Sequence, residues 1–245
     1  MKNIKLTIEY EGTNYSGWQK QENALAIQEL LEAALGELLN EKVKLIGSGR
    51  TDAGVHALGQ VANFRTNRSI PGDRYKHALK LYLPDDISIV DSEEVDLNFH
   101  SRFDAVGKVY KYLVYNGELP RAIYRNFAYH VPYNIDMDKM IEGSKYFIGS
   151  HDFAAFMAAN SEVNSTIRTI NQISIGRKGD LVDFEIEGNS FLRNMIRIIV
   201  GTLLYVGYGK IDPKDIEQII ASRKRKNAGP TAPPQGLFLK EVFYP

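Results

Sequence analysis

One order of predicted elements occurs twice along the chain, and this repetition limits the fold more than any other feature. Residues 3–10 alternate apolar and polar side chains, which is typical of a strand, and residues 27–39 place apolar side chains at helical spacing. The first half continues with two predicted strands, a short helix and a last strand, at residues 43–46, 59–66, 72–81 and 87–95. This is the strand–helix–strand–strand–helix–strand order of the split βαβ arrangement.

The second half shows a similar order without a plain repeat of sequence. Its predicted elements are a strand at 108–115, a helix capped by Asp136, a hairpin of 167–175 with 181–187, helices at 190–206 and 213–220, and a strand at 237–243. We therefore predict an α/β (α+β) fold of two split-βαβ halves, ferredoxin-like or RRM-like. Mainly antiparallel sheets would flank a central cleft. Residues 1–105 form the N-terminal half and residues 106–245 the C-terminal half.

Cysteine is absent from the 245 residues, and its absence excludes several kinds of chemistry. Disulfide bonds, thiolate nucleophiles and cysteine-ligated zinc cannot occur. No two of the five histidines stand four residues apart and the H-E-x-x-H motif is absent, so we expect no metal. The apolar stretch at 198–206 is much shorter than the roughly 20 residues of a membrane-spanning helix. Because the charged N-terminus is unlike an export signal, we expect a cytoplasmic protein.

The charges of the chain balance, with 30 basic and 30 acidic residues. Zero net charge argues mildly against a nucleic-acid partner, but the distribution along the chain matters more. Residues 91–96 hold four acids, whereas residues 223–226 read RKRK and residues 102–125 also lean basic. This segregation permits a positive face on a neutral protein, and it is equally consistent with solvated surface patches.

The most unusual segment is GSGRTDAGVHALG at residues 47–59, which joins two predicted strands. Its glycines permit tight turns and close backbone approach, but their spacing matches neither phosphate-binding fingerprint. One interpretation is a tight connection in which Asp52 bonds to nearby backbone. The other is a carboxylate held on a rigid loop and facing a cleft, with the cation of Arg50 two residues before it.

The predicted helix at 190–206 carries Arg193 and Arg197 four residues apart, so the two would share a face. Apolar neighbours flank Arg197, and a buried arginine needs a partner. Asp52 is one candidate, since an adjacent cation keeps a carboxylate ionised. The alternative is an exposed stripe on an amphipathic helix. Tyr110 and Tyr112 share a strand face, where they can stack on a nucleobase or simply cover a core.

Six segments, in order and spread over nearly the whole chain, carry a family resemblance. They are YEGTNYSGWQKQ (10–21), AIQELLEAAL (26–35), GRTDAGVHALGQVANF (49–64), FHSRFDAVGKVYKY (99–112), GNSFLRNMIRIIVG (188–201) and AGPTAPPQGLFL (228–239). The sequence resembles the TruA family of tRNA pseudouridine synthases, and GRTDAGVHA is the most specific of the matches. It departs from the family pattern at three positions. Ala26 stands where Thr or Ser is usual, Asp104 where a small residue such as Ser is usual, and Lys108 where Arg is usual.

The resemblance implies isomerisation of uridine to pseudouridine at positions 38, 39 and 40 in the anticodon stem-loop of tRNA. It implies that Asp52 is the essential carboxylate and that Tyr110 lies at the substrate base. Arg197 matches the arginine that pairs with the aspartate, and Arg50 matches one that helps to turn the target nucleotide out. The family works as a homodimer without metal or cofactor, so we expect the same here.

Two mechanisms remain open at this point. Asp52 either attacks C1′ of the ribose as a nucleophile or removes a proton from the sugar to give a glycal-like intermediate. Residues 229–236 would exclude water by closing the cleft, and phosphate contacts are expected from Arg50, Arg121, Arg125 and residues 223–226. The rival interpretations are a non-catalytic RNA-binding module and a glycosidase-like hydrolase that pairs Asp52 with another acid such as Asp104.

Overall fold

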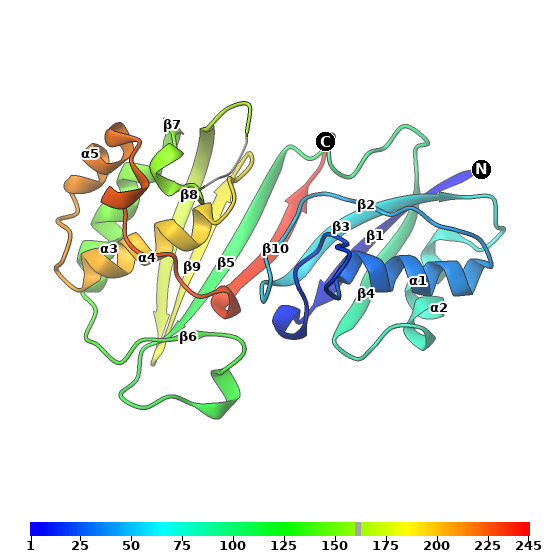
Figure 1. Cartoon of the computed structure of the whole chain (residues 1–245), viewed down its shortest axis with the longest axis horizontal. Coiled ribbons are helices and arrows are strands. Elements are labelled where there is room, and N and C mark those ends of the chain that lie inside the picture. Colours follow the sequence, from blue (N-terminus) through cyan, green and yellow to red (C-terminus); the bar gives the residue numbers. More distant parts are fainter. Residues whose placement is uncertain (160–162) are drawn as a thin grey trace. The chain divides into compact units, whose positions relative to one another are not determined.

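Residues 1–159 and 163–245 are described by the computed structural model (Figure 1). Unit 1 comprises Met1–Val106 together with Phe238–Pro245, and unit 2 comprises Gly107–Leu237. The last strand therefore belongs almost wholly to the first unit, although the sequence predicted residues 106–245 as one half. The reason is that residues 238–239 pair with residues 56–57, a strand far away in sequence. Local sequence patterns do not reveal such a pairing.

The sheet of unit 1 is built around β1 (Lys2–Tyr10). This strand pairs antiparallel with β3 (His56–Thr66) on one side and with β4 (Ile87–Val95) on the other. The opposite edge of β3 is shared by β2 (Ile46–Gly47), which is antiparallel to it, and β10 (Leu237–Phe243), which is parallel. Residues 48–55 thus connect two neighbouring strands of one sheet.

The helices of unit 1 are α1 (Ile27–Leu39) and the short α2 (Tyr75–Ala78). The inward face of β1, which consists of Ile4, Leu6 and Ile8, is completely buried. Five apolar residues of α1 are also buried, namely Ile27, Leu31, Ala34, Leu35 and Leu39. Sheet and helix therefore bury the two apolar faces that the sequence periodicity predicted. The strand predicted at residues 43–46 shrinks to Ile46–Gly47, because only these residues pair with β3.

The N-terminus of α1 has Ala26 at the cap position, with no side-chain hydrogen bond. Backbone oxygens of Gly17 and Trp18 accept the N–H groups of Ile27 and Gln28. The third residue of the helix, Glu29, has no hydrogen bond from a side chain at the cap position. We expect Ala26→Ser to create a capping box with Glu29 and to raise the free energy of unfolding by about 0.5–1 kcal/mol. Urea denaturation would measure the gain, and a loss instead would mean that the buried hydroxyl finds no partner.

Unit 2 has a sheet of successive antiparallel neighbours. Its strands are β5 (Gly107–Tyr115), β9 (Leu181–Gly188), β8 (Ile167–Lys178) and β7 (Gly149–Asp152), and β6 (Tyr129–His130) runs parallel to β5. The helices α3 (Met137–Ser144), α4 (Met195–Gly207) and α5 (Asp215–Ser222) lie together on one side of it (Figure 1). The predicted Asp136 cap is confirmed, since its carboxylate accepts the Lys139 N–H at 3.1 Å.

Helix α4 begins at Met195, five residues later than the sequence predicted. Asn194 lies in the left-handed region with φ of 62°, so the helix cannot extend through it, and the carbonyl of Arg193 accepts the N–H of Ala158 instead. Arg193 is exposed and outside the helix, so its predicted shared face with Arg197 is wrong. Helix α5 likewise begins at Asp215, after a turn in which Asp212 accepts the Lys214 N–H.

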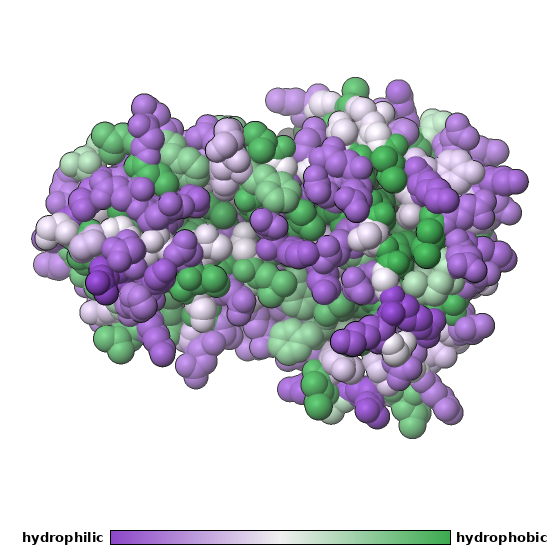
Figure 2. Space-filling view, turned by 180° about the vertical axis from the view of Figure 1, so that it is seen from behind, coloured by the Kyte–Doolittle hydropathy of each residue, from purple (hydrophilic) through white to green (hydrophobic). Residues whose placement is uncertain are grey.

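The fold class is confirmed as a mixture of helices and mostly antiparallel strands. On the face drawn in Figure 2, hydrophilic side chains are interspersed with smaller groups of hydrophobic ones. Within residues 1–159 and 163–245, no helix has the length and apolar character needed to cross a membrane.

Candidate active site

Asp52 lies in the loop of residues 48–55, between β2 and β3 of unit 1. The residue is half-buried, and its backbone oxygen accepts the Val55 N–H at 3.2 Å. Gly54 turns the chain with φ of +74°, a conformation that glycine adopts without a steric penalty. The tight connection expected from the glycines is therefore present, and Asp52 occupies its bend.

A second segment, residues 10–18, holds this loop in place. The Trp18 N–H donates to the Thr51 oxygen at 3.2 Å, and the Gly54 N–H donates to the Tyr15 oxygen at 3.3 Å. The Tyr10 and Thr51 hydroxyl groups are hydrogen-bonded at 2.8 Å. Burial raises the pKa of the Tyr10 phenol, so this bond stays between two neutral groups at neutral pH. The residues on both sides of Asp52 are thus fixed.

Two glycines let the segments approach so closely. A Cβ on Gly12 would lie 2.0 Å from the Val55 oxygen, and a Cβ on Gly17 would lie 2.4 Å from the Thr51 oxygen. Gly17 also has φ of +93°, which side-chain-bearing residues rarely adopt. The two sequence segments at 10–21 and 49–64 are therefore parts of one structure, and each is shaped to fit the other.

Hydrogen bonds from β3 hold the first part of the loop, residues 48 and 49. The Gln60 side-chain amide donates to the Gly49 oxygen at 3.0 Å and accepts the Ser48 hydroxyl at 2.7 Å. Arg50 follows these contacts directly and is exposed. His56 directly follows the loop, and its Nδ1 accepts the Gly12 N–H at 3.0 Å. At 1% exposure His56 serves as part of the scaffold.

Unit 2 carries the other two predicted site residues, and Tyr110 is on β5. Its half-buried ring meets Phe191 edge to face, with the ring centroids 5.3 Å apart. Tyr112, two residues further, is fully buried and donates its hydroxyl to the Pro233 oxygen at 2.7 Å. Burial raises the pKa of the Tyr112 phenol, so it remains a neutral donor. Tyr112 is therefore a core residue, whereas Tyr110 retains accessible surface.

Arg197 lies in the first turn of α4 and is bonded to the loop of residues 229–236. Its Nε donates to the Ala232 oxygen at 2.7 Å, and its Nη1 donates to the Asn194 side chain at 3.0 Å. The loop of residues 229–236 is anchored further along the helix, where the Gly229 N–H donates to the Thr202 hydroxyl at 2.9 Å. Arg197 is thus half-buried with a fixed orientation, rather than part of an exposed stripe.

The basic run at 223–226 divides into two kinds of residue. Arg223 forms an ion pair with Asp152 at 2.9 Å, and Arg225 donates to the Gly229 oxygen at 2.9 Å and the Thr231 hydroxyl at 3.0 Å. Lys224 and Lys226 are exposed, and so is Arg223. Two residues of the predicted phosphate-binding patch therefore have partners within the protein, and the lysines are the candidates for contact with RNA.

We expect Lys224→Gln with Lys226→Gln to weaken tRNA binding and to reduce the salt slope, d log K/d log[salt], by about 2 if both contact phosphates. Arg225→Gln should lower stability with a smaller change in that slope, because it releases the loop at 229–231. Filter binding at several salt concentrations measures the slope. An unchanged slope in the double lysine variant would exclude this patch from RNA contact.

Asp104, the candidate second acid of the hydrolase interpretation, takes part in a local turn. Its carboxylate accepts the backbone N–H of His100 at 2.8 Å. Among the described residues, no group of three or more His, Asp or Glu side chains is placed to hold a metal ion. The local bond gives Asp104 a structural role and does not favour a paired-acid mechanism.

Comparison with known proteins decides the family. The family model described as tRNA pseudouridine synthase matches residues 6–104 and 144–245, well over half of the chain. The chain belongs to this family. A protein of Acetivibrio thermocellus named tRNA pseudouridine synthase A is 55% identical over 244 residues, which cover all of both chains. One from Clostridium tetani, tRNA pseudouridine synthase A 2, is 51% identical over 99% of both chains, and one from Thermoanaerobacter sp. is 47% identical over all of both.

These relationships confirm the TruA-family resemblance and the enzyme class. The protein is an isomerase that converts uridine to pseudouridine in tRNA. A solved Cbf5–Nop10–Gar1 complex aligns with 83% of this chain and 45% of the other chain, at 17% identity and a TM-score of 0.42. A TM-score this low carries no weight in the assignment.

The structure thus places Asp52 and Arg50 on one loop of unit 1, Tyr110 on β5 of unit 2 and Arg197 on α4 of unit 2. The clamp on the Asp52 loop was not predicted from the sequence periodicity. Its sequence signal was the pair Gly12 and Gly17, because glycine permits close backbone approach. Asn194, which directly precedes α4 and bonds to Arg197, had no comparable signal.

Proposed function

We propose that the enzyme acts at positions 38, 39 and 40 in the anticodon stem-loop of tRNA, with Asp52 as the essential carboxylate. The observation that carries this proposal is the rigid placement of Asp52. Backbone and side-chain bonds fix Thr51 and Gly54 on either side of it, and the carboxylate belongs to the half-buried part of the loop. A positioned reactive group needs this kind of support, since small displacements strongly reduce rates.

The reaction breaks the bond between C1′ and N1, turns the uracil and joins C1′ to C5. The atoms of substrate and product are the same and no electrons are exchanged, so one ionised carboxylate suffices. Asp52 either forms an ester at C1′, which C5 then displaces, or removes a sugar proton and later returns it. Uracil leaves as a delocalised anion, which makes a second acid unnecessary. The C5 proton finally passes to Asp52 or to water, and N1 takes up a proton in exchange, so the product is neutral and the Asp52 carboxylate is regenerated.

Three further residues have distinct roles in the proposal. Arg197 pairs with the Asp52 carboxylate in the working enzyme and orients it through charge-assisted hydrogen bonds. Tyr110 stacks on and positions the target base, since a phenol with an ordinary pKa of about 10 is a poor base at neutral pH. Arg50 contacts the backbone of the flipped nucleotide and offsets part of the cost of unstacking it. The anchored loop at 229–236 helps to exclude water.

We further propose that the enzyme works as a cytoplasmic homodimer on the anticodon arm and needs neither metal nor cofactor. Incubation of the purified protein with unmodified tRNA, followed by mapping of pseudouridine at each position, tests the function. We expect product at 38, 39 and 40 wherever these are uridine. Release of free uracil would indicate a hydrolase, and binding without turnover would indicate an RNA-binding module.

The role of Arg197 is tested by two variants at that position. Arg197→Gln removes the cation and should lower kcat by about 10²-fold, because the charge on Asp52 and the substrate loses its partner during the reaction. Arg197→Lys keeps the positive charge and should retain more of that activity. Equal kcat values for the two variants, measured well below their unfolding transitions, would contradict the pairing.

A further inference from the structure

Unit 2 contains a cavity of about 220 Å³ that none of the predicted site residues except Arg121 and Arg125 touches. It is lined by Tyr115, Pro120, Arg121, Tyr124, Arg125, Ala128, His130 and Gln235. All but Gln235 come from the stretch between the two matched parts of the family model, residues 6–104 and 144–245. The family model therefore does not cover these lining residues, apart from Gln235.

Aromatic rings form one wall of the cavity. The Tyr115 and Tyr124 rings lie 5.3 Å apart with an angle of 31° between their planes, and His130 stacks on Tyr115 at 5.8 Å and 28°. Tyr115 is buried, and a bond of 2.8 Å between Nε2 of His130 and the Gly117 oxygen fixes the imidazole ring. The half-buried Tyr124 is the ring with surface left for another molecule.

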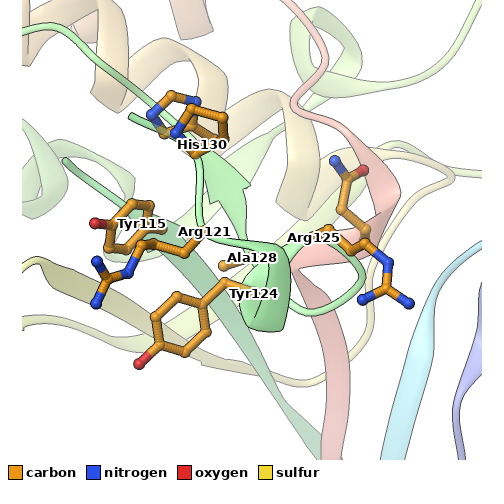
Figure 3. Close-up of a pocket in the computed structure, with 8 residues that line it drawn as sticks. Tyr115, Arg121, Tyr124, Arg125, Ala128 and His130 are labelled. Carbon is orange, nitrogen blue, oxygen red and sulfur yellow. The ribbon is translucent and has the colours of Figure 1, made fainter. Parts of the chain in front are cut away.

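A guanidinium group stands next to these rings. Figure 3 shows the side chains of Tyr115, Arg121 and Tyr124 gathered on one side of the cavity, with Arg125 turned toward the other. Arg121 and Arg125 are both exposed, but Arg125 donates to the Ala122 oxygen at 3.0 Å and so stabilises its own turn. An aromatic face beside an exposed cation provides the two contacts that a nucleobase and its phosphate require.

We propose that this cavity binds one unpaired nucleobase of the substrate tRNA, stacked on Tyr124, with the neighbouring phosphate on Arg121. Its volume lies below the roughly 300–1,000 Å³ of pockets for drug-sized ligands, which suits a single ring rather than a whole cofactor. The proposal rests on tRNA being the substrate. It adds a second point of contact for the RNA, distinct from the loop that carries Asp52.

Substitutions at Tyr124 test the stacking. Binding of unmodified tRNA is measured in an Asp52→Asn background, so the result does not depend on turnover. Tyr124→Leu should weaken binding by about 5- to 100-fold, the range for loss of one base–aromatic stack, and Tyr124→Phe should bind within about twofold of the parent. Equal affinities of all three proteins, or equal losses in Leu and Phe, would overturn the proposal.

Arg121 provides an independent test that preserves the rings. Arg121→Gln should reduce the salt slope of binding by about 1, while Lys145→Gln, which removes an exposed cation elsewhere in unit 2, should not.

Photo-crosslinking of tRNA that contains 4-thiouridine should label the tryptic peptides 112–121 or 122–125. The exposed Leu119 and Ile123 near the cavity permit a protein contact instead. A changed oligomeric state in Tyr124→Leu with unchanged tRNA affinity would establish that contact and overturn ours.

Discussion

Asp52→Asn should lower the rate of pseudouridine formation by at least about 10³-fold, because removal of a group at the centre of covalent or proton-transfer chemistry has effects of this size or larger. The amide has nearly the same shape but is neither a nucleophile nor a base. The clamp of Tyr10 and Trp18 on Thr51 does not involve the Asp52 carboxylate, so the loop should persist. Single-turnover assays with saturating enzyme measure the rate, and filter binding should give a tRNA affinity within a few fold.

Asp104→Asn is the matched control. It removes one carboxylate from the same unit and leaves an oxygen that can accept the His100 N–H. Activity should stay close to that of the parent protein. A large loss in this variant, together with release of uracil by the parent, would favour the paired-acid hydrolase. Full activity in Asp52→Asn would remove the basis of the proposed mechanism.

Gly17→Ala should lower the free energy of unfolding by about 2–4 kcal/mol, since it combines an unfavourable φ with a steric overlap. The new methyl group would stand 2.4 Å from the Thr51 oxygen, so the segment at 10–18 and the loop at 48–55 must move apart. Displacement of Asp52 should also reduce kcat by about 10²-fold in the protein that remains folded. Urea denaturation measures the first effect, and assays well below the unfolding transition measure the second.

Gly36→Ala makes the same chemical change at a position with room for it. Gly36 is inside α1, its φ is not positive, and the added carbon would be at a normal contact distance, 3.4 Å from the Glu41 oxygen. This variant should gain up to about 1 kcal/mol because alanine favours the helix. If Gly17→Ala were as stable and as active as Gly36→Ala, the close approach of the two segments would not matter for the site.

Local patterns were sufficient for most elements of the fold. The alternation in β1, the helical spacing in α1 and the turn between β8 and β9 each depend on neighbouring residues, and the structure has these elements at the predicted places. The predicted boundaries of elements were wrong where a contact with a distant residue replaced a local hydrogen bond. Helix α4 could not begin at Ser190, because the Arg193 carbonyl bonds to Ala158 and Asn194 is left-handed.

The amino-acid sequence by itself determined which residues are candidates for the chemistry: a carboxylate between glycines at Asp52, and no thiol at any of the 245 positions. It also determined the family, through motifs spread over the chain. Only the tertiary structure decided which of several similar residues keeps accessible surface and which is buried or hydrogen-bonded within the scaffold. Tyr112 is buried under the 229–236 loop while Tyr110 keeps exposed surface, and Arg225 holds that loop while Lys224 faces solvent. Side-chain type and spacing are local properties, whereas burial and hydrogen-bond partners depend on residues distant in sequence.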